Sequence, residues 1–216
     1  MRINDEAPNF TAQSTAGDIN FHDWCKDSWT LFFSHPKDFT PVCATEISTL
    51  SASESEFTKR NCKLIGLSVD SLDSHFDWLN DMKQTYGANI QFPIIADENL
   101  HVSKLYNMLP ADTVAEGKRS AADNATVRTV YIISPDLKIK MMMAYPMTTG
   151  RDVEELLRVV DSIQLTAGHK VATPVNWRSG QDVIIAASVS DDEAKKLFPE
   201  GWKSINAYTR VVGQPK

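Results

Sequence analysis

Short apolar runs alternate with amphipathic stretches along the first half of the chain. Residues 29–34 (WTLFFS) and 62–70 (CKLIGLSVD) have the length and the apolar content of buried strands. The stretch between them, residues 41–59, carries apolar side chains at helical spacing and therefore predicts a helix. The apolar positions of this helix are Ile47, Leu50 and Phe57.

The same alternation continues along the chain. Residues 74–87 predict an amphipathic helix that Gly87 closes, residues 92–97 a third short strand, and residues 99–106 a short helix. The expected apolar face of the first of these helices consists of Phe76, Leu79 and Met82. Polar, irregular residues at 110–125 then indicate an exposed loop.

Two strands and a long helix follow this loop. Residues 126–134 predict a strand, a Pro-Asp turn reverses the chain, and residues 139–145 return as the antiparallel neighbour. Residues 150–166 predict a helix with an apolar stripe. The stripe consists of Val153, Leu156, Leu157, Val160 and Ile163. This order of elements predicts an α/β fold, with a mixed central sheet flanked by helices on both faces.

The pattern of the sequence changes after about residue 170, where turn residues become frequent and apolar residues few. Residues 171–216 contain turn signals, a short strand near 183–187 and a short helix near 191–197. Their few apolar residues are not enough to build a core alone, so this segment is expected to pack on the main domain or on a second subunit. We therefore predict a main domain at residues 1–170 and a small C-terminal extension at 171–216.

Composition and charge narrow the class of protein. The 216 residues include 28 acidic and 22 basic side chains, and the formal net charge of −6 argues against nucleic acid as the main partner. Neither a signal peptide nor a long apolar membrane segment is expected. Three cysteines without a CxxC pair fit neither a disulfide framework nor a zinc site. We therefore expect a cytosolic protein without a metal or another cofactor.

One of the cysteines stands where the first strand leads into a helix, in HPKDFTPVCATE (residues 35–46). Thr40 suits the N-cap and Pro41 the first helical position, which places Cys43 in the first turn. Unpaired backbone N–H groups and the helix dipole favour a thiolate there, and a thiolate is a nucleophile. The alternative is a buried cysteine that acts as a small apolar residue, and this is the interpretation we prefer for Cys25 and Cys62.

Four stretches carry a resemblance to a known family. PKDFTPVC matches the PxxxTxxC signature of peroxiredoxins, and Glu46 fits the acidic position that follows. The wider SHPKDFTPVCATE, with RTVYIISPD, AYPMTTGR and VATPVNW, resembles the one-cysteine, peroxiredoxin-6-like subfamily along nearly the whole chain. The resemblance implies a thioredoxin-like fold with a C-terminal extension used in dimerisation.

The resemblance also implies a role for each matching residue. Cys43 would be the peroxidatic cysteine, Thr40 would hydrogen-bond the thiolate and the peroxide, and Arg128 would place its guanidinium beside the sulfur. Pro36 would shield the thiolate from water, and His35 would lie near the pocket. A supporting network of charges is expected from Glu46 and Arg151.

The implied activity is the reduction of hydrogen peroxide and small organic hydroperoxides by a homodimer. Two-cysteine relatives resolve the sulfenic acid with a second cysteine, typically in a C-terminal segment, but no cysteine follows Cys62 in this chain. An external thiol is therefore implied as the reductant. Glutathione, thioredoxin and glutaredoxin all remain open.

Two other functions compete with the peroxidase. Relatives of this subfamily are associated with a phospholipase A2 activity that matches Ser28, His22 and Asp136, yet Lys26 and Thr30 replace the glycines of the GxSxG elbow. The second competitor is a chaperone or redox-signalling protein, and it does not require the threonine and arginine of the peroxidase pattern.

Overall fold

The computed structural model describes residues 1–113 and 124–215. These residues form two compact units, 1–153 and 154–216, and each unit is described by itself. The sequence-based division at residue 170 stays a prediction. Most of the loop predicted at 110–125 lies outside the described residues.

A seven-stranded mixed sheet forms the centre of the first unit, in the strand order β2-β1-β5-β4-β3-β6-β7. Strands β3, β4 and β5 run parallel, whereas β6 is antiparallel to β3 and β7 antiparallel to β6. The sheet confirms the predicted mixed architecture. The strands are β1 (Thr11–Ser14), β2 (Gly17–Asn20), β3 (Trp29–Ser34), β4 (Cys62–Ser68), β5 (Ile94–Ala96), β6 (Arg128–Ile133) and β7 (Ile139–Tyr145).

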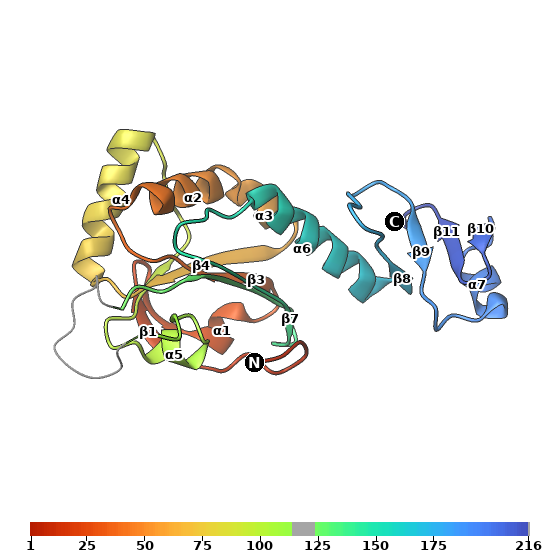
Figure 1. Cartoon of the computed structure of the whole chain (residues 1–216), viewed down its shortest axis with the longest axis horizontal. Coiled ribbons are helices and arrows are strands. Elements are labelled where there is room, and N and C mark those ends of the chain that lie inside the picture. The colour runs from red at the N-terminus through yellow and green to blue at the C-terminus, as the bar shows by residue number, and fades with distance from the viewer. Residues whose placement is uncertain (114–123, 216) are drawn as a thin grey trace. The chain divides into compact units, whose positions relative to one another are not determined.

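Helices cover both faces of this sheet, as the sequence predicted. Figure 1 shows α2 and α4 on one face and α1 and α5 on the other. The helices are α1 (Phe21–Cys25), α2 (Pro41–Ala52), α3 (Glu54–Lys59), α4 (Leu72–Tyr86) and α5 (His101–Leu105).

An aromatic group fills the core on the α1 and α5 side of the sheet. The rings of Phe10 and Phe21 stack with centroids 4.6 Å apart, and Tyr106 meets Phe32 edge-on at 4.9 Å. All four side chains are buried. Fully burying side chains of this size contributes on the order of 2–3 kcal/mol each, so this cluster is a large part of what holds the helices to this face of the sheet.

Two features of the first unit differ from the sequence-based expectation. The helix predicted at 41–59 is two helices, because the backbone leaves helical geometry at Ser53 (φ −95°, ψ 0°). The hairpin β1–β2 and helix α1 were not predicted. Their strands are four residues long and mostly polar, and such strands give little periodic signal.

The buried face of helix α4 matches the predicted face only in part. Met82 is buried as predicted, together with His75 and Trp78, whereas Phe76 is 49% exposed. The inward histidine is tolerated because its ring nitrogens face the carboxylate of Asp38 and the carbonyl of Ile95. Gly87 (φ 63°) ends the helix as predicted.

The second unit contains helix α6 and a small antiparallel sheet in the order β10-β11-β9-β8. Two small apolar clusters hold it together, one around Trp177 and one around Ile185. The short strand and the short helix predicted there are confirmed, whereas the β10–β11 hairpin was not predicted. The elements are α6 (Val153–Gly168), β8 (Val171–Ala172), β9 (Val183–Ile185), α7 (Asp191–Leu197), β10 (Lys203–Asn206) and β11 (Thr209–Val212). Across the described part of the chain, no helix combines the length and apolar character that a membrane span requires.

Two of the three cysteines belong to the packed interior of the first unit. Cys25 ends α1 and Cys62 begins β4, and both side chains are buried. Burial raises the pKa of Cys25 to about 11, against smaller opposing effects of Thr30 and Lys63. Burial likewise raises the pKa of Cys62 to about 12. Both thiols therefore stay protonated at neutral pH, as a structural role requires.

We expect both interior thiols to resist alkylation in the folded chain. In a Cys43→Ser variant at pH 8, iodoacetamide should modify Cys25 and Cys62 at least about 100-fold more slowly in buffer than in 8 M urea, because thiols react as thiolates. Peptide mass mapping of quenched samples measures both rates. Labelling of either residue in buffer at the denatured rate would contradict the assignment.

Candidate active site

Cys43 lies in the first turn of α2, as the sequence predicted. Thr40 precedes the helix with extended backbone angles (φ −119°, ψ 143°), and Pro41 opens it. The Thr40 side chain makes no capping hydrogen bond; its hydroxyl donates instead to the carbonyl of Lys37 at 2.8 Å. Cys43 itself is buried, so its sulfur faces protein groups at the electropositive end of the helix.

The residue beside the sulfur is Arg128, which comes from a distant part of the chain. Its Nη1 donates to the Sγ of Cys43 at 3.4 Å and to Glu46 Oε2 at 2.6 Å. The carbonyl of Met147 accepts two further hydrogen bonds, from Nε at 2.8 Å and from Nη2 at 2.6 Å. Four hydrogen bonds thus hold a guanidinium that is only 2% exposed, which fixes its position against the sulfur.

Glu46 links this guanidinium to a second one. The Arg151 side chain donates to the Glu46 carboxylate from Nε and from Nη2, both at 2.8 Å. Its backbone N–H donates a third hydrogen bond at 2.7 Å. Arg151 Nη1 also donates to the carbonyl of Ser34 at the end of β3, at 2.9 Å. The predicted supporting network therefore exists as a chain of contacts from Arg151 through Glu46 and Arg128 to Cys43.

Electrostatics keeps this network ionised despite its burial. Burial by itself would raise the pKa of Glu46, but the charges and hydrogen bonds of Arg151 and Arg128 outweigh it and hold that pKa below its usual value. Burial lowers the pKa of Arg151, and Glu46 opposes this effect. Two buried guanidinium groups therefore face one carboxylate, which leaves an excess positive charge next to the sulfur of Cys43.

His35 and Pro36 are both buried in the segment that joins β3 to α2. His35 Nε2 contacts the carboxylate of Asp38 at 3.0 Å, and within the described part of the chain no hydrogen bond joins this ring to Cys43. Both backbone groups of His35 are hydrogen-bonded. Its N–H donates to the carbonyl of Leu67, and its carbonyl accepts from the hydroxyl of Thr126. The histidine thus belongs to a neighbouring group of side chains.

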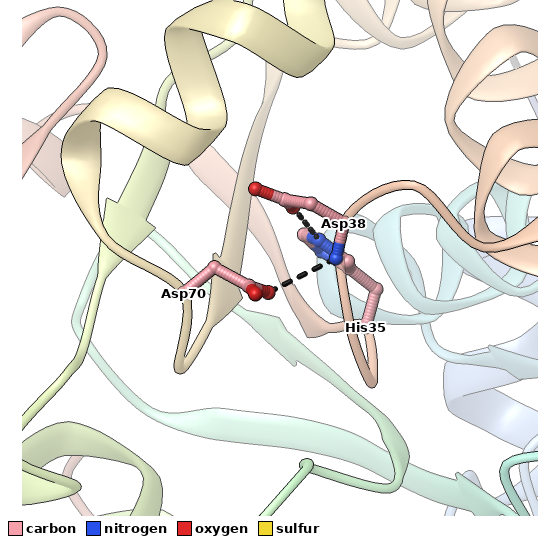
Figure 2. A group of neighbouring side chains, drawn as sticks. All are labelled: His35, Asp38 and Asp70. Carbon is pink, nitrogen blue, oxygen red and sulfur yellow. Dashed lines mark hydrogen bonds and ion pairs between the residues drawn. The ribbon is translucent and has the colours of Figure 1, made fainter. Parts of the chain in front are cut away.

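The sequence analysis missed this neighbouring group, which we call the Asp38 cluster: His35, Asp38, Asp70 and His75. Figure 2 shows the Asp38 carboxylate directed at the His35 ring, and the Asp70 carboxylate directed at the backbone nitrogen of Asp38. His75 contacts the other carboxylate oxygen of Asp38 at 2.7 Å. The sequence offered one signal for this cluster: His75, a histidine within the amphipathic pattern of α4.

The Asp38 cluster has the composition of a metal site. Ligand atoms of His35, Asp38 and Asp70 lie within 4.8 Å of one another, and all three residues are buried. Hydrogen-bond donors already face the carboxylates, however: Ser74 donates to Asp38 at 2.9 Å and Ser68 to Asp70 at 2.8 Å. Donors aimed at these oxygens compete with a cation, so we describe the group as a hydrogen-bonded cluster.

The three residues of the competing hydrolase do not contact one another through any hydrogen bond of the described chain. Ser28 is buried and donates to the carbonyl of Cys25. His22 contacts the carbonyl of Ala7, and Asp136 accepts from Ser134. Each polar group is satisfied locally, and the geometry does not favour the phospholipase alternative.

Asp38 makes stability depend on pH in the acid range. Burial would raise its pKa, but hydrogen bonds and charge from His35 and His75 hold the pKa well below its usual value. The stability that the ionised carboxylate contributes is therefore fully present above the pKa of an unfolded aspartate, about 3.9. It is lost as the pH falls further. We expect Asp38→Asn to lower the free energy of unfolding by about 3 kcal/mol at pH 6.

The difference in unfolding free energy between wild type and Asp38→Asn should shrink as the pH falls from 5 to 2, because the unfolded wild-type carboxylate then takes up a proton while the folded one stays ionised, which favours unfolding. Urea titrations of both proteins at a series of pH values measure it. A difference that is the same at pH 6 and at pH 2 would show that the carboxylate charge is not the source of the stability.

Comparisons with known proteins show the family of the chain. Residues 3–142 match the model of the AhpC/TSA family, and residues 162–202 match the C-terminal domain of 1-Cys peroxiredoxin. Peroxiredoxin-6 of Rattus norvegicus is 48% identical over 225 residues, which covers 100% of this chain and 98% of the relative.

Two solved structures resemble the whole chain. A mutant of the peroxiredoxin 6 of Arenicola marina has a TM-score of 0.91 at 42% identity, covering 100% of this chain and 99% of the other. A yeast mitochondrial 1-Cys peroxiredoxin, described with a thiol resolving mechanism via glutathione/thioredoxin systems, also has a TM-score of 0.91, at 46% identity with 99% of each chain covered. The chain therefore belongs to the AhpC/TSA family and, within it, to the 1-Cys peroxiredoxins, which are thiol peroxidases with a thioredoxin-like fold.

Proposed function

We propose that this protein reduces hydrogen peroxide and small organic hydroperoxides through the sulfur of Cys43. The observation that carries the proposal is the contact of 3.4 Å between Arg128 Nη1 and Cys43 Sγ, at the first turn of α2. The excess positive charge of the two guanidinium groups supports a thiolate, whose negative charge would balance it.

In the proposed reaction the Cys43 thiolate attacks one peroxide oxygen and forms an S–O bond while the O–O bond breaks. The other oxygen leaves with the bonding electrons as hydroxide or alkoxide and takes up a proton to become water or an alcohol. Arg128 stabilises the charge that develops on this oxygen, and one well-placed donor of this kind contributes roughly 2.7–4 kcal/mol. The planar guanidinium suits this task, since it can donate to sulfur and oxygen together.

Thr40 would supply a second donor to the reacting atoms. Its hydroxyl lies one helical turn before Cys43 and donates to the Lys37 carbonyl in the absence of substrate. We propose that it exchanges this acceptor for the thiolate or the peroxide. The burial of Pro36 supports a role in shielding the thiolate from water, and the burial of His35 a role in shaping the pocket.

Reduction of the oxidised sulfur would need a thiol from outside the chain. The Cys43 sulfenic acid would condense with this thiol to a mixed disulfide and water, and a second thiol would then release Cys43. Buried, protonated Cys25 and Cys62 are poorly suited to this attack. Glutathione, thioredoxin or glutaredoxin is the proposed reductant, and the description of the yeast relative supports the first two.

We also propose a homodimer in which the extension at 171–216 contributes to the interface. Large apolar side chains of the second unit are exposed, with Val175 at 88%, Ile205 at 57% and Tyr208 at 83%. A contact with a second copy would cover them.

The cytosol is the proposed compartment because the three cysteines are unpaired, although the yeast relative is mitochondrial. The net charge of −6 supports partners other than nucleic acid.

Replacement of Cys43 tests the proposed function directly. Cys43→Ser should abolish the consumption of hydrogen peroxide in the presence of a thiol reductant, because serine is not a comparable nucleophile at neutral pH. Cys25→Ser and Cys62→Ser are the matched controls and should retain most of the turnover. Loss of turnover in a folded Cys62→Ser variant would instead indicate an internal resolving thiol.

Excess peroxide should drive the sulfur beyond the sulfenic acid. Without a resolving cysteine, Cys43 should accept a second oxygen atom and become sulfinic acid when no reductant is present. Intact mass spectrometry during a peroxide titration should show a two-oxygen adduct, and Cys43→Ser should not form it. An intramolecular disulfide without that adduct would count against the single-cysteine mechanism.

A further inference from the structure

The carboxylate of Asp38 is the most heavily bonded group in the segment that leads into α2. Oδ1 contacts His35 Nε2 at 3.0 Å, and Oδ2 contacts His75 Nδ1 at 2.7 Å and accepts from Ser74 Oγ at 2.9 Å. Only 2% of Asp38 is exposed. Two of these partners belong to helix α4, so the carboxylate ties the segment to a separate, rigid element.

The backbone of Asp38 is held as firmly as its side chain. Its N–H donates to Asp70 Oδ2 at 3.0 Å, and this oxygen also accepts from the hydroxyl of Ser68 at the end of β4. The residue is therefore fixed from two sides, by α4 through its carboxylate and by the end of β4 through its amide. Figure 2 shows the second of these contacts, from Asp70 to the Asp38 backbone nitrogen. Buried hydrogen bonds to charged groups are stronger than those between neutral groups, so the loss of this anchor would be large.

The residue that follows Asp38 has a strained backbone conformation. Phe39 has a φ of 53°, and its side chain is 57% exposed. This left-handed region is strained for a bulky residue, because its Cβ comes close to the following carbonyl oxygen. The half-exposed ring packs against Trp78, with centroids 6.5 Å apart. A conformation of this kind persists only where the surrounding contacts enforce it, and Asp38 supplies such contacts directly before it.

The strained turn decides where the reacting groups lie. Thr40 follows Phe39 immediately, its hydroxyl bonds back to Lys37, and α2 with Cys43 starts at the next residue. Arg128 is held from outside the turn and α2 by the carbonyl of Met147, which accepts two of its hydrogen bonds, whereas its partner Glu46 lies in α2 itself. A shift of the turn would therefore move the Thr40 hydroxyl and the start of α2 relative to a guanidinium that Met147 keeps in place.

We propose that Asp38 is a positioning residue for the peroxidase reaction: clamped by His75 and Ser74 of α4, it holds the Phe39 turn in the geometry that brings Thr40 and Cys43 to Arg128. This inference rests on the proposed function, because it specifies how the same site is aligned. Asp38 acts through the backbone of the turn and does not itself touch the reacting atoms.

The test separates alignment from general stability with two buried aspartates. Asp38→Asn removes the clamp, whereas the control Asp97→Asn weakens a carboxylate that caps α5 through the backbone N–H groups of Val102 and Ser103. Asp97 is also buried, at 5% exposure. Rapid-quench intact mass should measure the rate constant for Cys43 oxidation by hydrogen peroxide in each folded variant.

We expect this rate constant to fall by about tenfold or more in Asp38→Asn and to stay within about twofold in Asp97→Asn, since small misplacements of reacting groups slow a reaction strongly. The rate of Cys43 alkylation by iodoacetamide is the second readout. Alkylation needs the sulfur but not its alignment with Thr40 and Arg128, so it should fall much less than the peroxide rate in Asp38→Asn.

Ser74→Ala provides a milder variant in case Asp38→Asn does not fold. It removes one of the three contacts to the carboxylate and should slow the peroxide reaction by about threefold or more, because the other two contacts remain. Hydrogen exchange of residues 37–43 should be faster in Ser74→Ala than in wild type. This measurement reports on the turn without any peroxide chemistry.

Three results would overturn the inference. One is an unchanged peroxide rate in Asp38→Asn and Ser74→Ala, and another is an equal loss of peroxide and alkylation rates in both aspartate variants. The third is unchanged hydrogen exchange across residues 37–43. Failure of the proposed function looks different, because wild type itself would then not react with hydrogen peroxide whatever the exchange data show.

Discussion

The candidate active site depends on one buried carboxylate placed between two guanidinium groups. Glu46 binds both Arg128 and Arg151, and without it two like charges would lie buried side by side without this shared counter-charge. With it, Arg128 is fixed beside the Cys43 sulfur while the group keeps an excess positive charge. That excess favours a negative sulfur, so the burial that protects the site from water also strengthens the electrostatic effect on it.

The thioredoxin-like sheet supplies the scaffold on which these charges meet. Strand β3 ends at Ser34 and leads into the segment before α2, while its neighbour β6 begins at Arg128. The turn after β7 brings Met147 and Arg151 to the same end of the sheet, where their backbone and side-chain groups complete the network. Elements far apart in sequence thus supply one site because neighbouring strands bring their ends together.

The other side of the site is a short turn rather than a regular element. Phe39 is strained and exposed, and the Asp38 cluster beneath it supplies the contacts that oppose the strain. The same side chains account for a departure from simple amphipathic patterning in α4, where His75 points inward and Phe76 outward. A polar residue on the buried face of a helix is stable where donors and acceptors meet it, and here they do.

The sequence by itself determined the order of most helices and strands, the α/β class and the position of Cys43 in a first helical turn. Those features depend on local periodicity, on caps and on Pro41, all of which act within a few residues. Periodicity could not place Arg128 beside the sulfur, because the two residues are 85 positions apart; only the family resemblance indicated it. The Asp38 cluster was found by neither route. Tertiary structure alone decided it, because a buried hydrogen-bond network is satisfied by whichever donors and acceptors the packed sheet and helices bring into contact.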